Sequence, residues 1–146
     1  MINDFKPYID RIFKGEQNVF WPTPIKWFAK SSGTTSDKSK YIPISFESLE
    51  DCHYKASKDL LALYCHNHPD TQIFNGGKGL IIGGSHQVSK INEDIYYGDL
   101  SAVLLQNLPL IARYFRTPSM ETALMDNWEK KLVQMAKEIV NENVTH

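Results

Sequence analysis

The residues with the clearest chemical potential form one run, Ser31–Lys40, in which hydroxyl side chains surround a single glycine and lysines follow. A glycine lets backbone N–H groups approach an anion closely, hydroxyls add hydrogen-bond donors, and lysine adds positive charge. The run stands between two apolar, strand-like segments, Ile25–Ala29 and Tyr41–Ile44. This composition indicates a loop that can hold a phosphate chain. An ordinary polar hairpin loop is the alternative, because serine, threonine and glycine favour turns in any case.

The run is not a Walker A loop. That motif needs Gly-x-x-x-x-Gly-Lys-Ser/Thr, and its last residue opens a helix. Here four residues separate Gly33 from Lys38-Ser39, the second glycine is missing, and a strand-like segment follows. The Gly-x-Gly-x-x-Gly fingerprint of dinucleotide-binding folds is also absent from the sequence.

Gly83-Gly84-Ser85-His86 is a second candidate site. Two glycines at the end of a strand permit close approach of a ligand. The alternative is a tight turn with an incidental histidine.

Two cysteine–histidine groups, Cys52-His53 and Cys65–His68, raise the question of a metal site. On one helix the two cysteines would lie about 20 Å apart at ~1.5 Å per residue. That separation is too long for one zinc ion or a disulfide bond. We therefore expect no metal site there, but buried cysteines and surface histidines.

The overall composition describes an ordinary globular protein. The chain has 146 residues, 42% hydrophobic and 23% charged, with a net charge of -1. This charge does not favour a nucleic-acid or membrane binder, and no apolar run approaches the roughly 20 residues of a spanning helix. The N-terminus lacks the basic and apolar segments of a signal peptide, so we expect a cytoplasmic protein.

Apolar spacing and turn residues predict the elements of the first half. A helix is expected over 4–14, and strands over 25–30 and 41–45. Ser45 is expected to cap a helix over 46–66. The predicted buried stripe of that helix consists of Leu49, Cys52, Ala56, Leu60 and Leu63.

The second half continues the alternation. Short strands are predicted over 80–82 and, with a weaker signal, over 86–91. A helix capped by Asp99 should run through Leu108 and end before Pro109, and a long helix should begin at Ser119. The apolar stripe of the long helix is expected at Leu124, Trp128, Leu132, Met135 and Ile139, and Lys130-Lys131 should form a solvated face. The fold class is therefore α/β with about four strands, fewer than the usual ~5–6.

At Trp27–Thr35 and Lys40–Ser45 the sequence closely resembles the GH3 auxin-responsive promoter family, and most of all its bacterial members. These proteins are acyl-acid–amido synthetases of the adenylate-forming superfamily. Further similar segments are Asp51–Lys55, Gly83–Gln87, Asn92–Asp94 and Tyr97–Ser101. The superfamily loop is usually Ser/Thr-Ser-Gly-Thr-Thr-Gly-x-Pro-Lys. This chain departs from it with Ser36 at the last glycine and one extra residue before Lys40.

The resemblance implies that the chain takes part in ATP-dependent joining of an acyl acid to an amino acid. It implies that Ser31, Ser32, Gly33, Thr34 and Thr35 bind the β- and γ-phosphates of ATP, and that Lys40 also contributes to phosphate binding. It makes Gly83, Gly84, Ser85 and His86 candidates for the substrate side. The Mg²⁺ ligands are expected mostly outside these residues.

Residues 1–146 are expected to be one piece of the large N-terminal, ATP- and acyl-binding domain, left by truncation or proteolysis. The sequence contains no Tyr-x-Ala-Ser-Glu-Gly-like motif, no second ribose-binding motif and no C-terminal lid domain. Such a piece should be inactive alone and prone to self-association, because sheet edges and apolar helix surface stay uncovered. The alternatives are a stand-alone nucleotide- or anion-binding module and a structural or interaction domain without a ligand.

Overall fold

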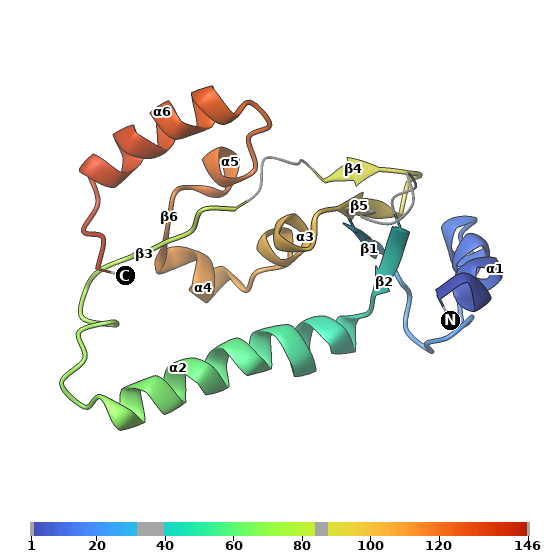
Figure 1. Cartoon of the computed structure of the whole chain (residues 1–146), viewed down its shortest axis with the longest axis horizontal. Helices are drawn as coiled ribbons and strands as arrows, with labels where there is room; N and C mark the ends of the chain where they lie inside the picture. The colour runs from blue at the N-terminus through green and yellow to red at the C-terminus, as the bar shows by residue number, and fades with distance from the viewer. Residues whose placement is uncertain (1, 32–39, 84–87, 146) are drawn as a thin grey trace.

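The computed structural model describes residues 2–31, 40–83 and 88–145. Helices and strands alternate along this part of the chain, which agrees with the predicted α/β class (Figure 1). In chain order the elements are α1 (Ile2–Phe13), β1 (Trp27–Ser31), β2 (Lys40–Ile44), the π-helix η1 (Ser48–Tyr54), α2 (Lys55–Asn67), β3 (Gly79–Leu80), β4 (Ser89–Lys90), β5 (Tyr96–Gly98), α3 (Leu100–Gln106), α4 (Leu110–Tyr114), β6 (Arg116–Thr117), α5 (Met120–Ala123) and α6 (Trp128–Val140).

The main sheet has four strands in the order β2-β1-β5-β4, and it confirms the expected sheet of about four strands. β1 and β2 pair antiparallel, with Ser31 opposite Lys40. β1 and β5 pair parallel, and β4 runs antiparallel to β5. The strand ends Ser31 and Gly98 and the strand starts Lys40 and Ser89 therefore share one edge of the sheet.

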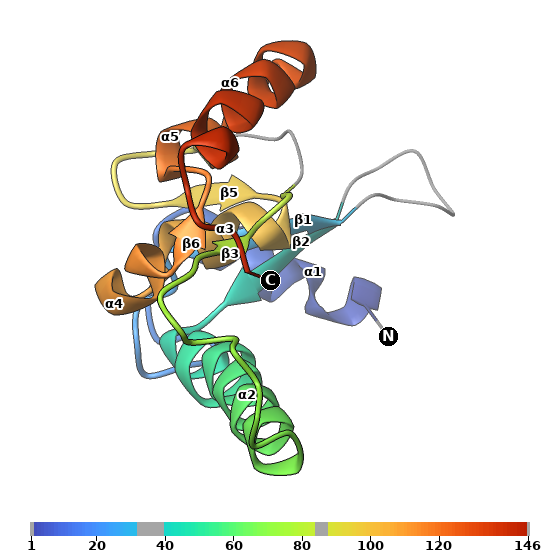
Figure 2. The ribbon, with the colours of Figure 1, turned by 90° about the vertical axis from the view of Figure 1, so that its left-hand side faces the viewer.

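Helices cover both faces of the main sheet, and the alternation of side chains along β1 explains how. Phe28 is fully buried toward α1, where Phe13 stacks on its ring with the centroids 4.3 Å apart. Burial of one such side chain contributes about 1.5–3 kcal/mol. Ala29 faces the opposite side, where it joins a cluster with Val103 of α3 and Tyr54 of η1. Figure 2 shows the sheet between α1 and α3.

A smaller layer lies beside the main sheet. β3 and β6 form a parallel pair of their own, and α5 and α6 pack near them (Figure 1). The strand predicted over 80–82 is therefore shorter than expected and belongs to this second sheet. The strand predicted over 86–91 is reduced to β4, and its residues 86 and 87 lie outside the described part of the chain. β6 could not be predicted from the sequence, because a strand of two residues is too short to show an alternation of apolar and polar side chains.

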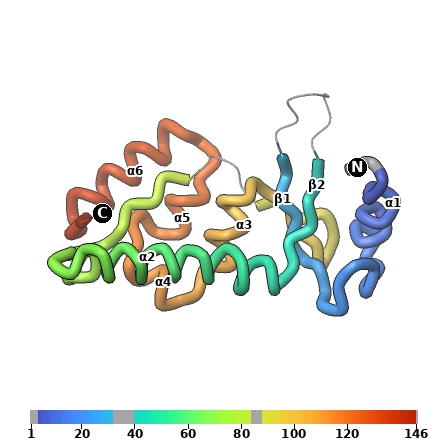
Figure 3. Tube along the Cα trace, turned by 60° about the horizontal axis from the view of Figure 1, so that its bottom comes forward, coloured from blue at the N-terminus to red at the C-terminus, as the bar shows by residue number. Residues whose placement is uncertain are grey.

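The helix predicted over 46–66 forms, but its expected buried stripe is wrong. Ser45 caps its start as predicted, since the Ser45 hydroxyl oxygen accepts the N–H of Ser48 at 3.1 Å. Leu49 is buried, whereas Leu60 and Leu63 are 67% and 58% exposed and no residue of α2 is buried. The physical reason is η1: a π-helix closes its hydrogen bonds over five residues. A 3.6-residue spacing counted through it does not keep Leu49 on one face with Leu60, although Leu60 and Leu63, both within α2, still share a face. Figure 3 shows α2 running along one side of the molecule.

The long helix predicted from Ser119 is two helices, α5 and α6. Ser119 caps α5 as expected, with its hydroxyl oxygen accepting the N–H of Thr122 at 3.3 Å. Asn127 then starts α6, because its side-chain oxygen accepts the N–H of Lys130 at 2.9 Å. A second N-cap therefore interrupts the predicted helix. Met135 is buried as expected, whereas Trp128 and Leu132 are each 45% exposed.

Candidate functional site

The candidate phosphate-binding segment connects β1 to β2. Of its assigned residues, Ser31 and Lys40 are described, and they lie directly opposite each other as the last pair of the antiparallel ladder. Lys40 is exposed and Ser31 is partly buried. Ser32, Gly33, Thr34 and Thr35 lie outside the described residues, so their assignment stays a prediction.

Parallel pairing brings a third strand end to the same place. β5 lies beside β1 with Ala29 opposite Gly98, and Asp99 follows at the N-cap position of α3. The sequence predicts Asp99 as a helix cap but contains no local signal that places it near Ser31. The connection depends on the parallel pairing of strands that are distant in sequence, and ligand sites of α/β proteins gather at such carboxyl ends.

The second candidate segment enters the described structure only at its first residue. Gly83 is partly buried, and its carbonyl accepts a hydrogen bond from Lys131 Nζ at 3.0 Å. Gly84, Ser85 and His86 lie outside the described residues. Ser89, just beyond them, begins β4 at the edge that also carries Ser31 and Lys40. The strand directions are thus compatible with one shared site, which remains a prediction.

Lys131 is a buried cation that the sequence prediction placed wrongly. It was expected on a solvated face, but it is 0% exposed. Its ammonium group donates to the carbonyls of Gly83 and Ala123, at 3.0 Å and 2.7 Å, and lies 5.7 Å from the Trp128 ring centre. Burial lowers the pKa of Lys131 below its usual value. The signal was present, because helical spacing puts residues 128, 131 and 135 on one face.

A carboxylate fixes α5 against α6. Glu138 accepts hydrogen bonds from the backbone N–H of Ser119 at 2.6 Å and from the Thr122 hydroxyl at 2.5 Å. Burial acts to raise the pKa of Glu138, but the bonds from Thr122, Ser119 and Gln134 together hold it below its usual value. The short helix α5 and its N-cap Ser119 are therefore held against α6, the helix that carries Lys131.

The cysteines differ from their prediction in exposure. Cys52 is exposed and Cys65 is partly buried, and both are free thiols. Neither is the buried core residue that was expected. Among residues 2–31, 40–83 and 88–145, no group of three or more His, Cys, Asp or Glu side chains could hold a metal ion.

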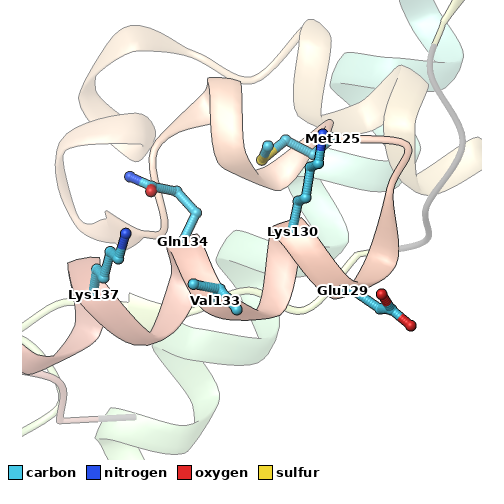
Figure 4. Close-up of a pocket in the computed structure, with 6 residues that line it drawn as sticks. All are labelled: Met125, Glu129, Lys130, Val133, Gln134 and Lys137. Carbon is cyan, nitrogen blue, oxygen red and sulfur yellow. The ribbon is translucent and has the colours of Figure 1, made fainter.

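Two hollows in the described surface lie away from the Ser31–Lys40 edge. One is on the outer face of α6 and is lined by Met125, Glu129, Lys130, Val133, Gln134 and Lys137. Figure 4 shows Glu129 pointing away from the other labelled side chains, so these residues do not converge on a ligand. Another hollow contains Lys26 and Ile95, which precede β1 and β5 at the opposite edge of the sheet. In the described part of the chain, no helix is long and apolar enough to cross a membrane.

Comparison with known proteins identifies the family. The model of the GH3 family N-terminal domain matches residues 3–146. The solved structure of the GH3.15 acyl acid amido synthetase shares the fold, with a TM-score of 0.68 and 21% sequence identity. That match covers 98% of this chain but only 24% of the synthetase. No curated protein matches the chain.

Proposed function

Because this chain belongs to the GH3 family, we propose that it forms the phosphate-binding part of an acyl-acid–amido synthetase. The observation that carries the proposal is the family match over residues 3–146, which includes the whole Ser31–Lys40 segment. The chain covers about a quarter, 24%, of the length of the synthetase that it matches in fold. The complete reaction therefore needs polypeptide beyond these residues.

The proposed reaction has two steps. An oxygen of the acyl acid's carboxylate attacks the α-phosphorus of ATP, the bond to the β-phosphate breaks, and pyrophosphate leaves. The product is a mixed anhydride, the acyl-adenylate. The amino group of an amino acid then attacks the acyl carbon, loses a proton, and AMP departs with the anhydride oxygen. The product is an acyl–amino acid amide.

Residues 31–35 are proposed to stabilise the charge that develops on the phosphates in the first step. Preorganised N–H, hydroxyl and lysine donors act most strongly where negative charge increases in the transition state. Ser31 and Lys40 face each other across the ends of β1 and β2, so one hydroxyl and one ammonium group flank the loop. The proposed donors Ser32, Gly33, Thr34 and Thr35 lie between them in sequence.

Magnesium ions accompany ATP in reactions of this class, where they neutralise phosphate charge. The described residues offer no cluster of carboxylates that fits such an ion. We propose that the Mg²⁺ ligands lie mostly outside this chain. Gly83, Gly84, Ser85 and His86 are proposed to line the substrate side, with Lys131 holding the first carbonyl of that segment in place. The proposed location is the cytoplasm, where ATP and amino acids are available.

The proposal is tested by carboxylate-dependent exchange of labelled pyrophosphate into ATP, in a polypeptide that extends this chain to the length of the synthetase. Thr34→Ala and Ser32→Ala should each lower the exchange rate about 10-fold or more, as expected for loss of one oxyanion donor. Thr71→Ala, in the turn after α2, is the matched control and should leave the rate unchanged. Unchanged exchange in both loop variants would remove the phosphate role.

The same assay separates this proposal from an anion-binding module without catalysis. Such a module binds polyphosphate but supports no exchange, whatever polypeptide is joined to it. It is also insensitive to the added carboxylic acid. A carboxylate-dependent rate in the extended polypeptide distinguishes the synthetase from this alternative.

A further inference from the structure

The residues that follow α6 pair with the segment that leads into β3. The backbone N–H of Lys78 donates to the Asn143 carbonyl at 2.8 Å, and the Lys78 carbonyl accepts the N–H of Thr145 at 3.1 Å. These two bonds join Lys78 to Val144 as a parallel β-bridge. Figures 1 and 2 both show the C-terminal end of the chain beside β3. The chain after α6 therefore runs in the same direction as β3.

Side-chain contacts support this pairing. The ammonium group of Lys78 lies 2.5 Å from a carboxylate oxygen of Glu142, and the two side chains are only 32% and 35% exposed. A partly buried ion pair of this kind is screened less by salt than an exposed one. Gly77 is buried, and a Cβ atom at this position would overlap the side chain of Thr145. Glycine at position 77 thus leaves the space that Thr145 occupies.

β3 binds β6 along only one of its two edges. The N–H groups of Gly79 and Ile81 donate to carbonyls at β6 and just before it, each at 2.8 Å. Successive residues of a strand direct their backbone groups to opposite edges. Leu80 and Ile82 therefore direct theirs to the edge at which Lys78 is paired. Among the described residues, β6 is the one strand that the smaller sheet sets beside β3.

The polypeptide after Thr145 is the segment best placed to occupy this edge. Residues 143–145 already stand at its beginning and run parallel to β3, so their continuation reaches Leu80 and Ile82 without a connecting turn. A strand edge with free N–H and C=O groups is a template for a further strand. Parallel sheets also occur mainly within larger α/β domains, and a pair of strands is too small to be stable alone.

We propose that the edge of β3 formed by Leu80 and Ile82 binds the polypeptide that follows Thr145 as a third parallel strand. The bridge at Lys78 pairs with position 144, and steps of two residues set position 146 opposite Leu80 and position 148 opposite Ile82. The next residues then lie beside Gly83, where they form a further wall of the substrate side. That last placement rests on the proposed synthetase function, whereas the strand pairing does not.

Disulfide crosslinking in the synthetase-length polypeptide tests the register. Paired residues of neighbouring strands lie about 4.8 Å apart with their side chains on one face, which suits a disulfide bond. In a cysteine-free background, Ile82→Cys should therefore crosslink with a cysteine at position 148. Ile82 is 64% exposed, so this substitution should leave the fold intact. A cysteine at position 147, whose side chain points to the opposite face, is the matched control and should react at least ~10-fold more slowly.

Failure of the pairing and failure of the synthetase function give different results. Equal crosslinking at positions 147 and 148, or none at either, would overturn the proposed pairing even if the polypeptide exchanges pyrophosphate into ATP. A preferred crosslink at position 148 in a polypeptide without this exchange would instead support the pairing and overturn the synthetase function.

Discussion

The substitution Lys131→Met gives the sharpest test of how the smaller layer is held to the segment that begins at Gly83. Methionine keeps most of the length and volume of the side chain but removes its ammonium group. That group is buried and donates to the carbonyls of Gly83 and Ala123 at 3.0 Å and 2.7 Å. The substitution therefore removes two charge-assisted hydrogen bonds while leaving the packing of α6 nearly intact.

The magnitude follows from these two contacts. A buried acceptor that loses its donor costs about 1–3 kcal/mol. Removal of the ammonium also removes the cost of burying a charge, the same cost that lowers the pKa of Lys131. We expect a net loss of about 2–3 kcal/mol. For a chain of this size, that corresponds to a fall in Tm of roughly 4–12 °C.

Urea unfolding and thermal melts of Lys131→Met and Lys130→Met provide the assay. Lys130 is the adjacent, exposed lysine, so its substitution makes the same change in charge and hydrophobicity. It should alter the free energy of unfolding by no more than about 0.5 kcal/mol. Equal stability of Lys131→Met and the wild type would refute the reasoning. Equal destabilisation by the two variants would refute it as well.

Three further predictions concern pH and ligand binding. Tyr54→Phe should cost about 0.5–1.5 kcal/mol near neutral pH, because the Tyr54 hydroxyl donates to the Leu104 carbonyl at 2.9 Å. Burial, with a contribution from Glu50, raises the pKa of Tyr54 to about 12. The wild type should therefore lose free energy of unfolding between about pH 10 and 12, and Tyr54→Phe should lose less. Urea unfolding over this pH range measures the difference. The lowered pKa of Glu138 stabilises the fold above about pH 4.5, and Glu138→Gln should flatten the loss of stability at lower pH; an unchanged acid profile would contradict this. The chain alone should bind ATP with magnesium too weakly to be measured in calorimetry, and a sub-micromolar Kd would mean that it is a complete nucleotide-binding domain.

The sequence predicted those helices and strands whose ends are determined by residues within or next to the element itself. The apolar spacing of α1, the cap residue Asp99 of α3 and the β-branched and aromatic residues of β1 and β2 each identify their element without help from distant sequence. The pairing of β1 with β5 was not predictable in this way. It joins strands separated by more than sixty residues, and it is what places Gly98 beside the Ser31–Lys40 segment.

Two failed predictions, the exposed Leu60 and Leu63 and the buried Lys131, share a further physical cause: a period shows which side of a helix is apolar but not what covers it. The stripe at Leu60 and Leu63 was identified correctly as one face, yet the described chain leaves it exposed. Lys131 shows the reverse case. Its long apolar stem and spacing from Met135 suit a buried position, and the carbonyls of Gly83 and Ala123 accept hydrogen bonds from its ammonium group. Those acceptors come from Gly83 and Ala123, which the helix pattern alone cannot reveal.

Titration of the isotope-labelled chain with inorganic triphosphate, followed through its amide resonances, tests the central claim most directly. The account predicts shifts at Ser31 and Lys40 that weaken with added salt, and weaker binding by Lys40→Gln. Lys26→Gln, the same change at the opposite end of β1 about 15 Å away, should bind triphosphate as the wild type does. Shifts centred on Lys26, equal weakening by both variants, or no shift at Ser31 and Lys40 would contradict a phosphate-binding role for this edge of the sheet.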